Sequence, residues 1–458
     1  MGVSGRWAMI AVCGCGGSSL TEMPDLTRAT DSNPASDIVE VSLVVDEATV
    51  EYVDGQRVSV LAYRDGAIDG STATVPGPMI VANQGDRLIV HVTNQLDRAT
   101  SVHWHGLRLP VDMDGVVPIE AGASFDFDFV LRDAGWFWYH PHVETDEQVE
   151  LGLQGGLLVH GADEPTFAVE RTFMLDDVEL ADGEVVIEPT HEDLVHGRRG
   201  NTLLVNGKPP GFLTTAAGSV ERWRIVNTSN GRFFRLSLGS RALRVIGWDG
   251  GLIRSPYDVT ELLIGPGERY DVMVTLEGAE GDELSLQTLE VLRGHGAIDR
   301  GPLELTQIRL GAATATRDEV PAMGPTLDVL PIGASTPARR FELSEQLEGP
   351  TGTFFFINDE RWPLNLPVEL RLGDLEVLEL VNETEGEHPI HIHGHFVQVV
   401  ERGGIATPPL GWKDTILVGP NETVRAAVRY DEPGMWMLHC QIPEHAERGM
   451  TADLDVQP

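Results

Sequence analysis

Apolar and polar residues alternate along short runs rich in Val, Thr and Leu, and Gly, Pro and Asp separate these runs. A period of two residues puts alternate side chains on opposite faces of a β-strand. Long stretches with the helical period of 3.6 residues are hard to find in this chain. Short strands between turn residues predict an all-β protein built of β-sandwich domains.

One strand pattern occurs three times along the chain, each time with a Gly and an Asn nine residues apart. The three copies are GDRLIVHVTN at 85–94, GSVERWRIVN at 218–227 and GDLEVLELVN at 373–382. This repeat predicts three copies of one β fold. The expected segments are a leader at 1–37, domains at 38–163, 164–312 and 335–458, and a Pro- and Ala-rich linker at 313–334.

Histidine pairs follow the repeated strand in the first and third copies only. Nine residues beyond the Asn lie His103, Leu236 and His391, and two residues further lie His105, Leu238 and His393. A spacing of two residues on a strand places both side chains on one face. The outer copies therefore present matching imidazole pairs and the middle copy presents an apolar pair, so we expect metal chemistry in the outer copies only.

A second correspondence links the far ends of the two outer copies. The segment GWFWYHPH at 135–142 matches GMWMLHCQ at 434–441, which pairs His140 with His439 and His142 with Gln441. If the outer domains pack face to face about a pseudo-twofold axis, these pairs converge on one site with seven histidines and a glutamine. Several imidazoles at one place suit a cluster of copper ions that binds O2.

Cys440 is the single cysteine outside the N-terminal segment, so it has no partner for an intramolecular disulfide. His445 and Met450 follow it at five and ten residues, and His388 begins the histidine motif of the third copy. Two imidazoles, a thiolate and a distant Met are the ligands of a blue-copper site, which transfers single electrons. His439 directly precedes Cys440, so one peptide unit links this site to the histidine pairs.

Four motifs occur in the same order as in the multicopper oxidases, a family that the chain resembles over essentially its whole mature length. They are HWHG at 103–106, HPH at 140–142, HPIHIHGH at 388–395 and HCQIPEHAERGM at 439–450. The resemblance implies three consecutive cupredoxin-like, Greek-key β-sandwich domains. It also implies an enzyme that takes single electrons from a small reducing substrate and uses them to reduce O2 to water.

The resemblance further implies a role for each motif residue and up to four copper ions per chain. The type 1 copper would be held by His388, Cys440, His445 and Met450, and the type 2 copper by His103 and His391. One copper of the type 3 pair would be held by His142, His393 and His439, and the other by His105 and His140. Electrons would pass through Cys440 and His439 to the trinuclear cluster.

The chain departs from the family pattern at position 441, where Gln441 replaces the third histidine of one type 3 copper. An amide oxygen is a harder and weaker ligand for copper than an imidazole. We therefore expect that copper to be loosely held, completed by a water or partly absent, and oxidase activity to be retained but altered. The alternative is a copper-binding scaffold without oxidase activity, a hypothesis that rests on Gln441.

Asp114 lies where the resemblance places an acidic residue that relays protons to the oxygen site, and O2 reduction consumes protons. An ordinary Asp-Gly turn is the competing interpretation. A family acid after the last type 1 histidine is replaced by Ala446, with Glu447 one residue on, and we interpret Asp414 as structural. The other histidines are expected to have surface or packing roles: His91, His160, His191, His196, His295 and His395.

The reductant is expected to dock at an exposed type 1 histidine, His388 or His445, beside Glu385 and Glu387. The 11 methionines are not clustered, whereas cuprous oxidases of the family tend to carry a Met-rich insert. We therefore favour a laccase-like enzyme that oxidises a phenol or an aromatic amine. The alternative enzyme is a metallo-oxidase that acts on ferrous, cuprous or manganese ions, which the acidic surface favours.

The net charge of −38 is spread along the chain, which excludes nucleic acid as a partner and favours cations. Arg6, the apolar run at 7–12 and Cys13-Gly14-Cys15 predict an export signal that ends in a lipid-attachment cysteine, Cys15. A plain signal peptide with a misplaced start is the alternative. We expect an exported monomer, either periplasmic or a lipoprotein at the outer membrane or surface of a bacterium.

Overall fold

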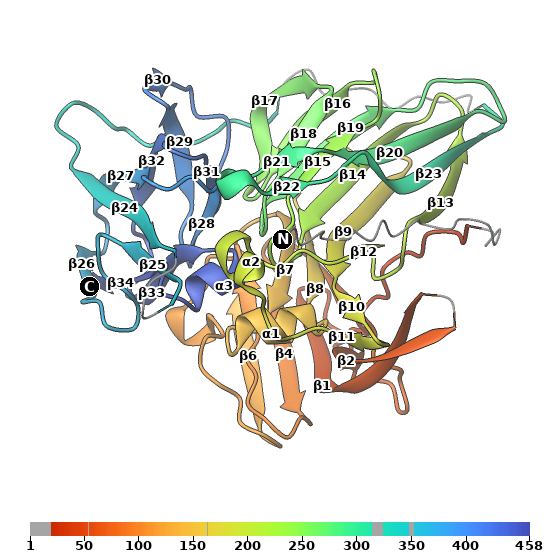
Figure 1. The fold of residues 1–458 in the computed structure, drawn as a ribbon, viewed down its shortest axis with the longest axis horizontal. Coiled ribbons are helices and arrows are strands. Elements are labelled where there is room, and N and C mark those ends of the chain that lie inside the picture. Colours follow the sequence, from red (N-terminus) through yellow and green to blue (C-terminus); the bar gives the residue numbers. More distant parts are fainter. Residues whose placement is uncertain (1–19, 54, 163, 314–323, 348–351) are drawn as a thin grey trace, which may run out of the picture.

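The computed structural model describes residues 20–53, 55–162, 164–313, 324–347 and 352–458, and these residues lie mostly in β-strands. Three β-sandwiches are seen at the bottom, upper right and left of Figure 1, in chain order. The prediction of an all-β chain of three sandwiches is confirmed. Cys15 and part of the linker lie outside the described residues, so the lipid anchor and the domain boundaries stay predictions.

The first sandwich contains two sheets, in the orders β2-β1-β4-β6 and β3-β8-β7-β5. The strands are β1 Ile38–Val53, β2 Gln56–Asp65, β3 Gly77–Asn83, β4 Arg87–Asn94, β5 His103–His105, β6 Ser124–Val130, β7 Gly135–His140 and β8 Gly155–His160. A short 3-10 helix, Val111–Met113, and the helix α1, Thr145–Glu150, lie in its loops. Along β4, alternate apolar side chains are buried, as the period of two predicts.

The second sandwich contains a six-stranded sheet, β12-β9-β14-β19-β16-β17, and a five-stranded sheet, β13-β23-β20-β15-β18. The six strands are β9 Glu170–Val178, β12 Thr202–Val205, β14 Val220–Asn227, β16 Leu243–Trp248, β17 Gly251–Val259 and β19 Arg269–Thr275. The five are β13 Gly211–Ala216, β15 Phe234–Ser237, β18 Glu261–Ile264, β20 Glu283–Leu289 and β23 Leu303–Gly311. Two small hairpins and two helical turns complete it: β10 Leu180–Ala181, β11 Glu184–Val185, α2 His191–His196, β21 Val291–Leu292, η2 Gly294–Gly296 and β22 Ile298–Asp299.

The third sandwich repeats this plan with the sheets β25-β24-β27-β32-β29-β30 and β26-β34-β33-β28-β31. The first sheet contains β24 Ala338–Gln346, β25 Phe354–Ile357, β27 Leu375–Asn382, β29 Val397–Arg402, β30 Ile405–Ala406 and β32 Thr423–Arg429. The second contains β26 Val368–Arg371, β28 His388–Ile392, β31 Thr415–Val418, β33 Gly434–Cys440 and β34 Thr451–Gln457. The helix α3, Pro443–Ala446, follows β33 and lies beside α1 and α2 near the centre of Figure 1.

The Asn that ends the repeated strand has the same role in all three sandwiches. The buried side chains of Asn94, Asn227 and Asn382 each donate to two or more backbone carbonyls across the following loop. Each side-chain oxygen also accepts the amide two residues further on. This Asn therefore shapes the loop that leads to the histidine pair in the outer sandwiches, which explains why it recurs.

The apolar core shows which sandwiches pack against each other. Buried side chains of the first and third sandwiches belong to one continuous cluster, whereas the second has a cluster of its own. The outer sandwiches therefore share an interface, as the matching histidine pairs predict. Among the described residues, no helix has the length and apolar character needed to cross a bilayer.

Candidate metal centre

Two strand pairs, one in each outer sandwich, present the candidate ligands. In the first sandwich, β5 pairs antiparallel with β7 and places His103 opposite His140. In the third, β28 pairs antiparallel with β33 and places His391 opposite His439. The same register occurs in both sandwiches, so the correspondence between the two far ends has a structural basis in equivalent strand pairs.

Seven histidines and Gln441 lie together between the first and third sandwiches, and we call them the histidine cluster. Its members are His103, His105, His140, His142, His391, His393, His439 and Gln441. His103 stacks on His393 with ring centres 4.0 Å apart, and His105 stacks on His391 at 3.7 Å. Three triads have ligand nitrogens within 4.8 Å of one another: His103, His391 and His393; His103, His105 and His140; His142, His393 and His439.

Most rings in the cluster are held by one nitrogen and leave the other without a partner. His103, His140 and His391 donate Nδ1–H to backbone carbonyls, and their Nε2 atoms are buried with no hydrogen bond to any described residue. His105 has the reverse arrangement, because its Nε2 lies 3.0 Å from Thr415 Oγ1 and its Nδ1 has no such partner. A buried nitrogen without a partner costs about 1–3 kcal/mol, and a metal ion removes that cost.

His393 and His439 give the sharpest test of whether the cluster fits a metal. Their Nε2 atoms lie 2.9 Å apart. His393 Nδ1 lies 2.8 Å from Asp114 Oδ2, and His439 Nδ1 donates to the Cys440 carbonyl at 2.8 Å. With both Nδ1 atoms protonated, the two Nε2 atoms direct lone pairs at each other, an arrangement that a cation between them stabilises. The donor set therefore fits copper, which imidazole suits.

Burial keeps the candidate ligands in the neutral form that binds metals. Desolvation lowers the pKa of His388 and His393 to about 3. Arg293 adds to this effect at His388, whereas Asp114 opposes it at His393. Desolvation is also the main cause of the lowered pKa values of His105, His140, His142, His391, His439 and His445. It raises the pKa of the Cys440 thiol, so the thiolate needs a bound cation to persist.

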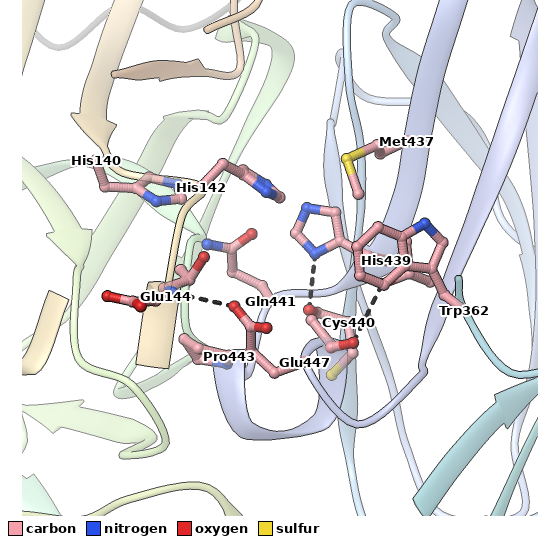
Figure 2. A pocket seen from close by; sticks show the side chains of 13 residues that line it. His140, His142, Glu144, Trp362, Met437, His439, Cys440, Gln441, Pro443 and Glu447 are labelled. Atoms are coloured by element: carbon pink, nitrogen blue, oxygen red, sulfur yellow. Dashed lines mark hydrogen bonds between the residues drawn. The ribbon is translucent and has the colours of Figure 1, made fainter. Parts of the chain in front are cut away.

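Gln441 lies beside His105 at the edge of the cluster. A Cβ atom added at Gly267 would lie 2.6 Å from Gln441 Cγ and 3.0 Å from His105 Cε1. Gln441 Oε1 is buried and has no hydrogen bond to a described residue. Figure 2 shows Gln441, His140, His142 and His439 around a cavity. The volume of this cavity is about 230 Å³. The cavity is large enough for a molecule such as O2, and its wall includes His140, His142 and His439.

His388, Cys440 and His445 form a second buried group, which we call the Cys440 site. Cys440 Sγ lies 3.6 Å from His388 Nδ1 and 3.7 Å from His445 Nδ1, and the two nitrogens are 3.2 Å apart. Met450 is fully buried, and its carbonyl accepts the Cys440 amide at 3.0 Å. Because His445 Nε2 donates to the Val195 carbonyl at 3.2 Å, its Nδ1 presents a lone pair to the site.

The expectation that His388 or His445 is exposed is wrong. His388 is 0% exposed and His445 is 2% exposed. His388 Nε2 forms a hydrogen bond with Thr384 Oγ1 at 2.9 Å, and α2 covers the His445 ring through Val195. The physical reason is that the second sandwich contributes a helix that covers the site. The ligand motifs of the third domain carry no information about this helix.

Asp114 occupies a buried position beside two of the cluster rings. Its Oδ2 lies 2.8 Å from His393 Nδ1, and its Oδ1 lies 3.3 Å from His103 Nδ1. Burial alone raises the pKa of Asp114, but His393 and His103 outweigh it and hold the pKa well below its ordinary value. Asp114 is therefore an ionised acceptor that orients both rings. Gly115 follows at φ 80°, so a turn is present as well, and the proton-relay role stays a prediction.

Sequence reasoning missed several residues around the cluster. Asp414, interpreted as structural, lies 3.3 Å from His105 Nε2 and 3.4 Å from His391 Nδ1. Arg269 and Thr415 both contact Asp414. Neither residue belongs to one of the four ligand motifs, so the sequence gives no signal for them. Of the histidines assigned to surface or packing roles, His395 contacts the His393 carbonyl and His91 lies between Asp126 and Glu40. His196 and His295 differ, because both lie near the Cys440 site.

Comparisons with known proteins agree with this geometry. Three family models described as multicopper oxidase match residues 53–164, 183–283 and 335–458. The multicopper oxidase MmcO of Mycobacterium tuberculosis is 32% identical, and the match covers 91% of this chain and 87% of that protein. This chain belongs to the multicopper oxidases. As a member of that family it is an oxidoreductase that uses O2 and a reducing substrate, with copper as its cofactor.

Other multicopper oxidases similar to this chain differ in what they are described to be. Laccase-1 of Cryptococcus neoformans is 27% identical, with 84% of this chain and 76% of that protein covered. A solved structure from Campylobacter jejuni, described as a metallo-oxidase, has a TM-score of 0.85 and 26% identity over 96% of each chain. Structural neighbours of this kind confirm the three cupredoxin-like sandwiches.

Proposed function

We propose that the chain is a laccase-like oxidase that couples one-electron oxidation of a phenol or an aromatic amine to the four-electron reduction of O2 to water. The observation that carries this proposal is the peptide link between Cys440 in one buried ligand set and His439 in the other. That link gives electrons a short covalent path between the sites. When bound, copper supplies the electron transfer and the oxygen chemistry.

The assignment of residues to copper ions follows the sequence motifs and the ring nitrogens that have no hydrogen-bond partner. The Cys440 site, with Met450, would hold the type 1 copper, and His103 and His391 the type 2 copper. His142, His393 and His439 would hold one type 3 copper, and His105, His140 and Gln441 the other. This last set is supported by three buried atoms that have no hydrogen-bond partner among the described residues: His105 Nδ1, His140 Nε2 and Gln441 Oε1.

The other groups of the site exclude bulk water, orient the ligands and admit the small molecules of the reaction. Asp114 holds the rings of His393 and His103, as described above. The cavity beside Gln441 gives O2 and water a route to the cluster, and the Glu447 carboxylate on its wall accepts the Thr145 amide at 3.0 Å (Figure 2). The amide of Gln441 is a weaker donor than imidazole, so we expect that copper to bind least tightly.

Copper-loaded wild-type protein and a Cys440→Ser variant test the proposal together. We expect the wild type to show a blue absorption band, type 2 paramagnetic resonance and O2 uptake with a phenol. The variant should lose the band and the uptake but keep the copper of the histidine cluster, since only one thiolate ligand is removed. A wild type that holds a type 1 copper alone and consumes no O2 with any reductant would favour the scaffold hypothesis instead.

A metallo-oxidase is the second candidate, and one arrangement near the Cys440 site favours it. The η2 turn holds His295 at φ 52°, with Nε2 at 2.8 Å from Glu345 Oε1 and Nδ1 at 3.6 Å from Glu385 Oε2. Electrostatic interaction with His295 contributes to the lowered pKa of His388, so this group lies near the Cys440 site. An imidazole between carboxylates suits ferrous or manganese ions.

Charge-neutral variants separate the two candidates. Glu385→Gln removes a carboxylate beside His295, and Glu383→Gln is the matched control, because Glu383 is also exposed but pairs with Arg340. A metal-ion substrate predicts that kcat/KM for ferrous ion falls in the Glu385 variant only, while kcat/KM for a phenol stays unchanged in both. Equal losses for ferrous ion in the two variants would mean general electrostatic attraction and no metal site.

A further inference from the structure

A buried ion pair joins the second sandwich to the third directly behind the histidine cluster. Arg269 begins β19 and is 1% exposed, and Asp414, 0% exposed, precedes β31. The Arg269 Nη1 and Nη2 atoms each donate to one oxygen of the Asp414 carboxylate at 2.6 Å. This two-pronged geometry fixes the plane of the carboxylate, which a single ammonium group does not do.

The remaining donors of Arg269 are also satisfied. Its Nε donates to the Trp136 carbonyl at 3.0 Å, Nη1 to the Gly267 carbonyl at 3.2 Å and Nη2 to the Asp249 carbonyl at 3.1 Å. With Asp414, these acceptors use all five N–H groups of a guanidinium. A fully bonded buried guanidinium has one position, so Arg269 is a rigid support that touches all three sandwiches.

Asp414 transmits this rigidity to the cluster. Its Oδ1 lies 3.3 Å from His105 Nε2 and accepts the Thr415 hydroxyl at 2.9 Å. Because Thr415 donates to Asp414, its own oxygen is left to accept from His105 Nε2, 3.0 Å away. Both neighbours therefore require a proton on His105 Nε2 and leave the lone pair on Nδ1. Among the cluster rings of the described chain, His105 is the one whose Nδ1 is buried without a hydrogen-bond partner.

Two glycines provide the space that this arrangement needs. A Cβ atom at Gly106 would collide with Arg269 Nη2 and lie 2.8 Å from Asp414 Oδ2. Gly267 brings backbone against His105 and Gln441, as noted above. The glycine of the HWHG motif is therefore required by the ion pair as well as by its own φ of 89°.

We propose that Arg269, in the sandwich that supplies no metal ligand, is a positioning residue that acts through Asp414 to select Nδ1 of His105 as the copper-binding atom. The inference deepens the proposed function and rests on its assignment of His105 to the copper beside Gln441. Since Gln441 is the weak donor of that set, the copper depends on His105 and His140. Outer-sphere partners of this kind typically change metal affinity about 10- to 100-fold.

The test uses two matched substitutions in the second sandwich. Arg269→Lys keeps the charge but loses the two-pronged geometry. Arg222→Lys is the control, since Arg222 is 0% exposed and pairs with Glu164 and Asp271, away from the cluster. Thr415→Val removes the other acceptor of His105 Nε2 and the hydroxyl that donates to Asp414, but it leaves Arg269 and Asp414 in place. This variant keeps the test informative if the Arg269 variant does not fold. Nitrogen-15 histidine spectra of the copper-free proteins report the tautomer of each ring, and a His105→Gln variant assigns the signal.

We expect wild-type His105 to carry its proton on Nε2, and the Arg269 and Thr415 variants to show mixed tautomers. In competition with a chelator, both variants should lose affinity for one copper by about 10- to 100-fold, while the Arg222 variant matches the wild type in both measurements. A proton on Nδ1 in the wild type, or equal effects at Arg269 and Arg222, would overturn the inference. The expected tautomers in a protein without O2 uptake would contradict the proposed function and leave the positioning role supported.

Discussion

At the scale of single residues, the two nitrogens of most imidazoles in the histidine cluster have separate roles. One nitrogen is held by a carbonyl, a carboxylate or a hydroxyl, and the other is left to bind metal. Tying the first nitrogen fixes the ring and its tautomer before copper arrives, which lowers the entropic cost of binding. Gln441 breaks this pattern, because its side-chain oxygen is buried with no described partner to orient it.

Gln441→His is expected to tighten copper binding at the proposed type 3 site beside His105. An imidazole is a better copper ligand than an amide, and the cavity of about 230 Å³ next to Gln441 leaves room for ring movement. Elemental analysis after dialysis against a chelator should show higher copper content in the variant. Gln398→His in β29 is a control for a new histidine elsewhere in the third sandwich. Unchanged copper content in the Gln441 variant would mean that wild-type Gln441 does not limit occupancy.

At the scale of elements, short strands place ligands and a short helix covers them. The pairs β5–β7 and β28–β33 have equivalent registers, so two copies of one local design form the two halves of the cluster. The helix α2 belongs to the second sandwich and covers the His445 ring. Its first turn is fixed by a capping box, in which Thr190 accepts from the Asp193 amide and Asp193 accepts from the Thr190 amide.

Thr190→Ala is expected to loosen α2 and to ease access to the Cys440 site. Loss of an N-cap costs about 0.5–2 kcal/mol, so the free energy of unfolding should fall by about 1 kcal/mol. Reduction of the proposed type 1 centre by a bulky phenol should then speed up relative to reduction by a small phenol, because fraying of α2 exposes His445. Stopped-flow absorption measures both rates. Thr93→Ala, which removes a surface contact with Ser124 in β6, is the control and should leave the ratio unchanged.

At the scale of the whole molecule, the site depends on all three sandwiches although two supply the ligands. The first and third share one apolar core, and the histidine cluster lies at their interface. The second adds α2 above the Cys440 site and Arg269 behind the cluster. Enclosing so many imidazoles in the interior lowers their pKa values, and this links the stability of the copper-free protein to pH.

His388 illustrates the sign of this linkage. Its pKa is about 3 in the folded chain and about 6.5 when unfolded, so the unfolded chain binds more protons between these values. The contribution of His388 is therefore present above pH about 6.5 and is lost as pH falls toward 3. His388→Gln removes this titrating group. Between pH about 3 and about 6.5, the difference in the free energy of unfolding between copper-free wild type and variant should therefore change by about 1.4 kcal/mol per pH unit. Urea unfolding at several pH values measures this stability difference. Burial and the neighbouring Asp177 raise the pKa of Asp176 to about 8, but Asp176 is present in both proteins, so its contribution cancels in the difference. A difference that stays constant with pH would contradict the prediction.

The sequence by itself determined the parts of this protein that local geometry controls. A period of two residues fixes which side chains share a strand face, so the histidine pairs and the three repeats are visible without a structure. The adjacency of His439 and Cys440 is covalent and does not depend on folding. Gln441 was recognisable from the repeat, because it occupies the position equivalent to His142 in the matching segment.

Only the tertiary structure decided which atoms of these residues are available. The hydroxyl that selects Nδ1 of His105 belongs to Thr415, 310 residues further along the chain. The carbonyl that covers His445 belongs to Val195, 250 residues before it. Hydrogen bonds between segments so far apart follow from the packing of whole sandwiches, and no periodicity or spacing along the chain encodes them. The candidate ligands are therefore a property of the sequence, whereas their available donor atoms and their exposure are properties of the fold.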